Sequence, residues 1–323
     1  MIQHILDFLF VQPEFSNKNE NCMTNILARE PVLLHIFFTD GTDYFIKVAT
    51  EHIDNSIQIQ EESVSHKVAE EKDLYSSVRR IGREYDALVK YSKIYPNLLP
   101  ETIFFRKFDR HAILVTKGIR HSAVNLNDIL RAKPSIRSQI QHLLIGRDRI
   151  ISTDRNELSN LALVLDHALN SLPAYLIQNF QNIRLAHNWD EMLVTLPLIP
   201  QHGDLALNNF GLTSTGLVLF DWEDYAFIKT PGFDLSILLV SGCRFDISKL
   251  VLLIENDFNQ SHNNSFLQPI IEGIGIKSSQ FYDLMLINLI IFYQLKCQHG
   301  YGKEIIDSTE NALKILASSI GES

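Results

Sequence analysis

Three oxygen-bearing side chains, Asp204, Asn209 and Asp221, lie in two short polar clusters of QHGDLALNNFGLTSTGLVLFDWED (residues 201–224). Phosphoryl transfer needs these residue types. One carboxylate orients or deprotonates the attacking hydroxyl, and a carboxamide and a second carboxylate hold Mg²⁺ on the nucleotide phosphates. The glycines and hydroxyl residues between the clusters predict a hairpin over 210–220, which would bring the two clusters together.

The motifs HGDLALNN, LFDWED and PGFDLS follow one another in this order. Together they resemble the aminoglycoside phosphotransferase and choline kinase family of small-molecule kinases, whose fold is that of protein kinases. The resemblance implies that Asp204 is the catalytic base and that Asn209 and Asp221 are the Mg²⁺ ligands. It also implies that His202 and Asp234 brace the catalytic loop.

Lys47 in YFIKVA stands at the centre of a predicted strand, where a lone lysine is costly unless it has a partner or faces a cleft. This position suits the strand lysine that contacts the α- and β-phosphates in kinase-like folds. The stretch IGREYDALVKY resembles the R-E-x-x-A-L signature of the family. Glu84 is therefore the expected carboxylate partner of Lys47, in preference to Glu70 or Glu71.

The stretches LPETIFF and HAILVTKGI resemble the two strands that lead to the hinge between the lobes. Backbone groups of Val115, Thr116 and Lys117 would then hold the adenine. Two features depart from the family pattern. SNKNENCMTNILARE, before Pro31, contains no glycine, so the phosphates would need a differently built turn, and Ala206 and Asn208 stand where relatives often carry His-Pro-Gly.

The elements that must position these residues follow from periodicity. PVLLHIFFTDGTDYFIKVA predicts strands over 32–38 and 44–49 around an Asp-Gly turn. Apolar residues at alternating spacings of four and three predict an amphipathic helix over 73–94. ETIFFRKFDRHAILVTKG predicts two more strands around a polar turn at 107–110, and the polar stretch 51–72 reads as an exposed loop.

Beyond Gly118 the pattern becomes helical, with helices expected over 126–150, 155–182, 188–195, 233–242, 246–260, 279–297 and 303–319. The fold class is therefore α+β and bilobal, of the protein-kinase-like type. We expect an N-lobe over 1–117, built from a small antiparallel sheet and one long helix, which binds nucleotide. A mainly helical C-lobe over 118–323 would carry the catalytic loop, the metal site and the acceptor pocket, with a cleft between the lobes.

Composition and charge limit the classes of partner that the protein is expected to bind. The formal net charge of −9 disfavours a nucleic-acid binder, and three scattered cysteines suggest neither a disulfide framework nor a metal cluster. The N-terminus lacks the basic region of a secretory signal, and the longest apolar stretch, 284–295, is too short to cross a bilayer. We expect a cytoplasmic monomer or homodimer that binds neither nucleic acid nor membrane.

The sequence indicates the size of the acceptor more clearly than its chemistry. Only DWEDYAFIKT separates Asp221 from Pro231, too short a segment for a peptide platform, so a small hydroxyl acceptor is favoured over a protein.

The chemistry of the acceptor stays open. Acidic residues would suit an amine-bearing acceptor such as an aminoglycoside or amino alcohol, although Glu223 and Asp224 could simply lie on the surface. A second set is aromatic and could cage a quaternary ammonium or belong to the core, which their helical spacing favours. A sugar or nucleoside hydroxyl is equally compatible. The acidic set is Asp224, Glu255, Asp257 and Asp283, and the aromatic set is Phe281, Tyr282, Phe292 and Tyr293.

The expected function is Mg²⁺-dependent transfer of the γ-phosphoryl group of ATP or GTP to a hydroxyl of a small acceptor. The glycine-free turn leaves an alternative, a catalytically silent kinase-like module that binds nucleotide or a partner. An unusual protein kinase is a third interpretation, which the short segment after Asp221 disfavours. Trp222 is expected to serve packing rather than substrate contact.

Overall fold

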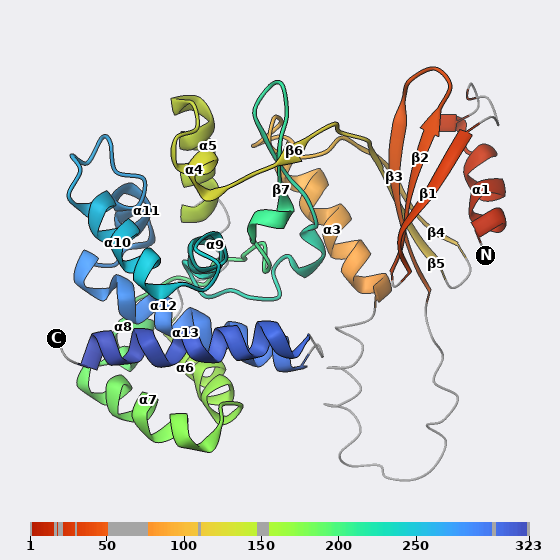
Figure 1. Cartoon of the computed structure of the whole chain (residues 1–323). Coiled ribbons are helices and arrows are strands. Elements are labelled where there is room, and N and C mark those ends of the chain that lie inside the picture. Colours follow the sequence, from red (N-terminus) through yellow and green to blue (C-terminus); the bar gives the residue numbers. More distant parts are fainter. Residues whose placement is uncertain are drawn as a thin grey trace, which may run out of the picture. The chain divides into compact units, whose positions relative to one another are not determined.

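The computed structural model describes residues 2–15, 18, 22–29, 31–50, 77–108, 111–146, 155–298 and 302–321. The loop expected over 51–72 and the candidates Glu70 and Glu71 lie outside these ranges. Two compact units are formed (Figure 1). The first contains residues 1–122 and 211–224, and the second contains residues 123–210 and 225–323.

The first unit contains an antiparallel sheet of five strands in the order β1-β2-β3-β5-β4. The hairpin predicted around Thr39–Thr42 is confirmed, with Val32 opposite Val48 and Phe37 opposite Asp43. Both later strands are also confirmed, whereas β1 was not predicted, because its apolar residues do not alternate with polar ones. The strands are β1 Cys22–Arg29, β2 Val32–Phe38, β3 Asp43–Thr50, β4 Thr102–Phe108 and β5 His111–Lys117.

One face of this sheet forms the core of the first unit. Leu34 of β2 pairs with Ile46 of β3, and neither residue is exposed to solvent. The helix α1 (Ile2–Phe10) covers this face through Ile5 and Leu9, whose spacing of four places them on one side of the helix (Figure 1). The apolar N-terminal patch is thus a core helix, which is followed by the short 3₁₀ helix η1 (Pro13–Phe15).

The opposite face carries Lys47, because side chains alternate along β3 and its neighbours Ile46 and Val48 point into the core. The helix α3 (Ser77–Tyr91) packs against β3, β4 and β5. It lies within the predicted range 73–94, ends before Pro96, and buries the predicted stripe at Val78, Ile81 and Leu88. Tyr85 stacks on Phe105 of β4, with ring centroids 4.9 Å apart.

The predicted hairpin over 210–220 is also confirmed. The strands β7 (Phe210–Leu212) and β8 (Leu217–Leu219) form a three-stranded sheet with β6 (Ser122–Ala123). Thr213 closes the turn by donating its hydroxyl to the carbonyl of Gly216 at 2.8 Å. The backbone N–H of Leu219 donates to the carbonyl of Leu98 at 2.7 Å, which anchors the returning strand. The short helix η4 (Trp222–Asp224) follows directly.

The described part of the second unit is mainly helical, as predicted, but the prolines divide two of the expected helices. Pro134 begins a new helix and Pro173 is the residue before another, because proline fits the start of a helix and disrupts its interior. The helix α11 was not predicted. The helices are α4 Leu126–Leu130, α5 Pro134–Ile145, α6 Arg155–Asn170, α7 Ala174–Ala186, α8 Trp189–Leu193, α9 Phe233–Gly242, α10 Ile247–Phe258, α11 Gln268–Ile274, α12 Phe281–Gln298 and α13 Lys303–Gly321, with 3₁₀ helices η3 Leu207–Asn209 and η5 Ser278–Gln280.

The helix α12 is the centre of the second unit. It is buried almost along its whole length and packs against α6, α9 and α13 (Figure 1). Asn288 of α12 donates to the carbonyl of Pro231 at 3.3 Å and to the hydroxyl of Ser236 at 3.2 Å. These bonds hold the N-terminus of α9, where Gly232 has a φ of 72°. The position of Asp234 in the first turn of α9 is thereby fixed.

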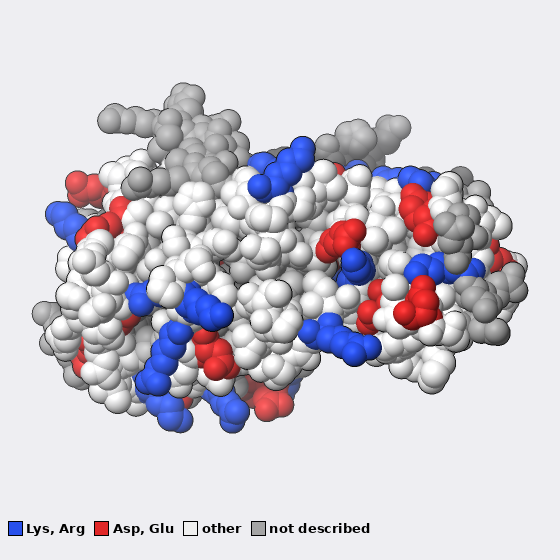
Figure 2. All heavy atoms as spheres, turned by 90° about the horizontal axis from the view of Figure 1, so that it is seen from above, with Lys and Arg blue, Asp and Glu red and all other residues white. Residues whose placement is uncertain are grey.

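The apolar stretch 284–295 lies in the core of the second unit. Among the described residues, no helix combines the length and the apolar character that a membrane span requires. Figure 2 shows basic and acidic side chains interspersed in small groups over the face seen there. Within the described part of this face, Lys and Arg do not form the continuous basic stripe that is typical of proteins that bind polyanions.

The core of the sheet predicts a stability difference between two leucines of the β1–β2 hairpin. Leu34→Ala should lower the free energy of unfolding by about 2 to 5 kcal/mol, because it leaves a cavity in a fully buried position. Leu27 is 53% exposed, so Leu27→Ala should change it by less than about 0.5 kcal/mol. Urea-induced unfolding measures both, and equal effects would contradict the observed facing of the sheet.

Candidate active site

Lys47 is held by two carboxylates that come from distant parts of the chain. Its Nζ lies 2.7 Å from Oε2 of Glu84 and 2.5 Å from Oδ1 of Asp221. The structure thus brings three of the predicted site residues together within the first unit. The pairing with Glu84 was predicted, whereas the direct contact with Asp221 was not.

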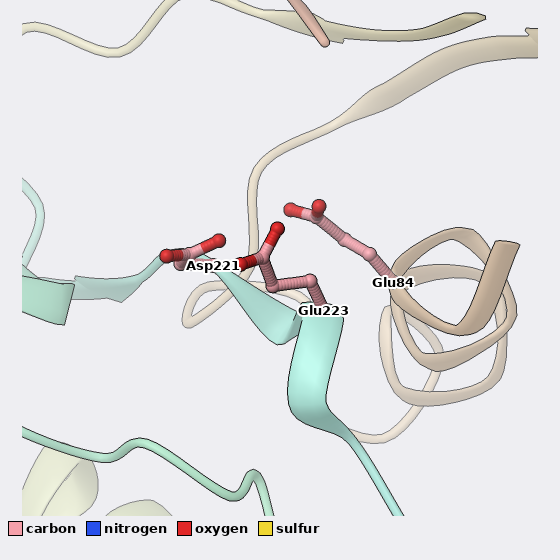
Figure 3. Close-up of side chains that lie close together, drawn as sticks. All are labelled: Glu84, Asp221 and Glu223. Carbon is pink, nitrogen blue, oxygen red and sulfur yellow. The ribbon is translucent and has the colours of Figure 1, made fainter. Parts of the chain in front are cut away.

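A third carboxylate, Glu223, completes the cluster. Figure 3 shows Glu84, Asp221 and Glu223 directed toward one another, from α3 and from the segment that follows β8. Each offers an oxygen, and these oxygens lie within 4.8 Å of one another. Burial alone would lower the pKa of Lys47, but attraction by the three carboxylates outweighs it and raises that pKa above its ordinary value. Lys47 is therefore a cation throughout the physiological range.

The carboxyl group of Glu223 has an unusual environment. Burial, followed by repulsion from Asp221, raises its pKa to about 7, although Lys47 and Arg80 act in the opposite direction. Arg80 pairs closely with Glu223 and lies 3.3 Å from Asp224. Both acidic residues are thus engaged by an arginine of α3, and neither is simply a surface charge.

The backbone at Asp221 is held in a rare conformation by its neighbours. Its φ is +62°, a value that costs a non-glycine residue on the order of 1 to 3 kcal/mol. The adjacent Trp222 is fully buried and stacks on Tyr91 of α3, with ring centroids 5.7 Å apart. Arg83 adds a bond from its Nε to the carbonyl of Glu223 at 3.2 Å. Trp222 is a packing residue, as predicted, and it anchors the turn that presents Asp221.

The loop that carries Asp204 lies in the second unit and is braced by Asp234. The carboxylate of Asp234 accepts the backbone N–H of His202 at 2.7 Å and that of Gly203 at 3.0 Å. Gly203 has a φ of 95°, which favours glycine at this position. His202 is fully buried. Asp234 thus contacts the loop through backbone groups, and a bracing role for the His202 side chain stays a prediction.

Asn209 and Asp204 are linked across the loop. The Nδ2 of Asn209 donates to the carbonyl of Asp204 at 2.6 Å, and the N–H of Ala206 donates to the same carbonyl at 2.8 Å. The side chain of Asp204 remains 22% exposed. A carboxylate on a rigid loop with part of its surface free is suited to orienting a hydroxyl.

Lys296 is a residue of this site that sequence reasoning missed. Its Nζ lies 3.1 Å from Oδ1 of Asp204, and its side chain is 8% exposed. The sequence did contain one indication of this residue, namely a lysine within the apolar run of α12. A lysine needs a partner when it is buried. The sequence alone gave no indication that this partner would be Asp204, because the two residues are far apart in the chain.

The overall arrangement was compared with known proteins. By sequence, the chain matches no protein-family model and no curated protein. By structure, it is similar to the choline kinase LicA from Streptococcus pneumoniae, with a TM-score of 0.56, 15% identity and 98% of each chain covered. LicA in complex with AMP matches with a TM-score of 0.53 and 15% identity, over 98% of this chain and 97% of that one.

A third similar structure is a thermostable mutant of the aminoglycoside phosphotransferase APH(4)-Ia. The TM-score is 0.55 at 12% identity, over 97% of this chain and 98% of that one. The chain has the protein-kinase-like fold of these small-molecule kinases. The predicted fold class is thereby confirmed, including the antiparallel sheet with one long helix and the mainly helical remainder.

Two features distinguish this kinase-like chain from the family pattern. Arg29 of β1 pairs with Val32 of β2, and the glycine-free stretch SNKNENCMTNILARE ends between these two residues in the sequence. β1 also contains a register shift between Ile26 and Ala28. How the phosphates would be held stays a prediction, and β1 was the element that the sequence did not reveal.

The predicted hinge residues Val115, Thr116 and Lys117 lie at the end of β5, which pairs with β3 on one side and β4 on the other. The N–H of Lys117 donates to the carbonyl of Glu101 at 2.8 Å, and the N–H of Gly118 donates to that of Asp43 at 2.7 Å. These two donors are engaged within the sheet, and contact of this stretch with adenine stays a prediction.

Several residues considered for the acceptor have structural roles. Asp257 accepts the backbone N–H groups of Phe266 at 2.8 Å and Leu267 at 2.9 Å, and Asp283 accepts Nε1 of Trp189 at 2.8 Å. These carboxylates hold loops and helices in place. The rings of Phe281, Phe292 and Tyr293 are buried in the core, as their helical spacing favoured.

Grooves are also lined by described residues of the second unit. One, of about 620 Å³, is lined in part by Arg131, Arg137 and Lys249. The other, of about 340 Å³, is lined in part by Glu255 and Asp283. Within the described part of the chain, neither lining includes a residue of the catalytic loop, so neither groove is assigned to the acceptor.

The environment of Glu223 predicts a pH-dependent stability. The folded state keeps the Glu223 proton up to about pH 7, whereas the unfolded chain releases it near the ordinary value, so the free energy of unfolding falls as pH rises between these values. From about pH 5 to about pH 8, wild type should lose roughly 2 kcal/mol more than Glu223→Gln. Urea unfolding with a metal chelator and without nucleotide measures the difference. Identical pH slopes would contradict the burial of this carboxyl group.

Proposed function

We propose that the chain is a small-molecule kinase that transfers the γ-phosphoryl group of ATP or GTP to a hydroxyl group of a small acceptor. The observation that carries this proposal is the ion pairing of Lys47 with both Glu84 and Asp221. A fold alone hosts many functions, so the argument must come from the site. A strand lysine paired with a helix glutamate, beside an aspartate that can hold Mg²⁺, is the arrangement that phosphoryl transfer uses in kinase-like folds.

The first unit would bind the nucleotide. Lys47 is charged and directed by Glu84, and so it can contact the α- and β-phosphates. The related fold of LicA binds AMP, which supports a nucleotide co-substrate here. The choice between ATP and GTP would depend on groups near Val115, Thr116 and Lys117.

The carboxylates of the first unit fit a divalent cation. Asp221 offers hard oxygen ligands and has a side chain that is 39% exposed, whereas that of Glu84 is 6% exposed. We assign Asp221 and Asn209 as the ligands of Mg²⁺, with Glu223 close to Asp221. When bound, Mg²⁺ would neutralise phosphate charge. Lys47 would move from Asp221 toward the phosphates, because Asp221 cannot satisfy both cations equally.

The second unit would supply the base. Asp204 is held by the loop bonds of Asn209 and Ala206, and its partly exposed carboxylate can orient and deprotonate the acceptor hydroxyl. Asp234 keeps the loop rigid by accepting two backbone N–H groups. A rigid loop reduces the reorganisation that transfer would otherwise need.

A catalytically silent module is the second candidate, and the glycine-free turn between β1 and β2 favours it. Against this candidate, each polar position that the reaction needs is filled. A protein kinase is disfavoured by the short segment from Trp222 to Thr230.

Nucleotide binding separates the kinase from a module that binds no nucleotide. Mg²⁺ and ATP together should stabilise the wild-type chain by about 2.7 kcal/mol at a hundredfold excess over Kd, and Asp221→Ala should abolish the Mg²⁺-dependent part. Asp86 is an exposed residue of α3, and Asp86→Ala is the matched control that should respond like wild type. Thermal unfolding measures the shift. No stabilisation of wild type by millimolar nucleotide would favour the silent module.

Asp204→Asn tests the transfer step itself. Loss of the base should reduce turnover by about 10²- to 10⁴-fold, because general-base catalysis contributes that much, while nucleotide affinity is retained. Asp190→Asn, which removes a carboxylate that pairs with Arg184 on the surface, is the control. Product formation is followed over a panel of hydroxylated metabolites and antibiotics. Full turnover by Asp204→Asn would exclude Asp204 as the base.

A further inference from the structure

Lys296 is a cation built into the position where the acceptor must approach. It lies in the last turn of α12, with its Nζ 3.1 Å from Oδ1 of Asp204 and 4.9 Å from the centroid of the Phe292 ring. Its side chain is 8% exposed, compared with 22% for that of Asp204. The carboxylate of Asp204 is thus neutralised on one side and reaches solvent on the other.

Burial of an ammonium group is tolerated here for two reasons. The Asp204 carboxylate supplies an opposite charge at hydrogen-bonding distance, and the face of Phe292 supplies a cation–π contact. The spacing of four residues on one helix places Lys296 beside Phe292. The ammonium is therefore a fixed part of the loop environment.

This pair changes what the catalytic loop offers an acceptor. An uncompensated Asp204 would attract a compound with an ammonium group near its hydroxyl. With Lys296 in contact, the charge of Asp204 is already engaged, and a second ammonium placed beside it would be repelled by the first. Asp257 and Asp283 offer such a compound little compensation, because backbone and indole donors already occupy them.

We propose that Lys296 determines the charge class of the acceptor. It would favour an uncharged or anionic hydroxyl compound, such as a sugar or a hydroxy acid, over an amino alcohol or aminoglycoside. This inference rests on the proposed function in one respect, namely that the acceptor hydroxyl meets Asp204. Lys296 acts on specificity through the charge beside the base.

The experiment compares pairs of compounds that differ in charge and little in shape. Choline is paired with 3,3-dimethylbutan-1-ol, in which carbon replaces the charged nitrogen, and glucosamine is paired with glucose. Binding is measured by ligand-observed NMR with Mg²⁺ and a non-hydrolysable ATP analogue, and product formation is measured with ATP. The readout is the ratio of the neutral to the cationic member of each pair.

Wild type should prefer the neutral member of each pair. Lys296→Met should shift the ratio roughly tenfold toward the cationic member, because the repulsion is removed and Asp204 is left uncompensated. Lys296→Arg keeps the charge and should keep the wild-type preference. A purely structural role for Lys296 would weaken both members equally and leave the ratio unchanged.

Lys314 provides a matched control in the same unit. Its Nζ lies 2.7 Å from Glu310 and 4.8 Å from the centroid of the Tyr175 ring, so it too combines an ion pair with an aromatic contact. Lys314→Met should leave the ratio unchanged. Thermal unfolding of each variant reports whether the fold is retained, and Lys296→Arg keeps the test decisive if Lys296→Met is unstable.

Each result decides between defined alternatives. A wild-type preference for the cationic members, an unchanged ratio in Lys296→Met, or binding of neither member of a pair would overturn the role of Lys296. If binding shows the expected ratios but no product forms with any variant, the proposed transfer fails while the charge preference stands. If product forms in ratios that Lys296 does not affect, the transfer stands and the charge preference fails.

Discussion

The ammonium group of Lys47 is the constraint on which the first unit depends. A buried cation is stable only if carboxylates meet it, and here they come from α3 and from the segment after β8, while Lys47 itself comes from β3. Three elements must therefore be in register at one point. The stacking of Trp222 on Tyr91 and the pairing of Arg80 with Glu223 reinforce the same junction. Packing and charge thus select one arrangement, and the backbone strain at Asp221 is a cost that this junction can sustain.

The second unit uses the same physical device at its own reactive loop. Asp234 is a buried carboxylate whose charge is satisfied by two backbone donors instead of a lysine, so it fixes the course of the loop and not a side chain. Asp204 is in turn met by Lys296 from α12. α12 also holds the start of α9 through Asn288, so one buried helix both supports the brace of the loop and contacts Asp204.

Local signals made much of this structure predictable. The Asp-Gly turn indicated the β2–β3 hairpin and the apolar stripe indicated α3. The roles that the spacing of Asp204, Asn209 and Asp221 suggests remain predictions. Pro134 and Pro173 also indicated helix boundaries, because proline disrupts the interior of a helix. The periodicity of the apolar residues alone does not show these boundaries. The strand β1 was not predictable in this way, because it lies at the sheet edge with Met23 and Leu27 exposed and lacks alternation. Its identity depends on pairing with β2, which is a tertiary property.

The contact between Lys296 and Asp204 shows most clearly what sequence patterns omit. The aromatic residues of α12 suggested either a cage for a quaternary ammonium or a helix core, and the structure places Phe281, Phe292 and Tyr293 in the core. Phe292 is a core residue, and a cation does lie beside its ring, but the chain itself supplies that cation one helical turn later. Periodicity could place Lys296 next to Phe292 and could not place either beside Asp204, because that depends on how α12 packs against the loop. A lysine in an apolar helix therefore indicates that a carboxylate partner lies nearby in the fold, although the sequence does not say which carboxylate it is.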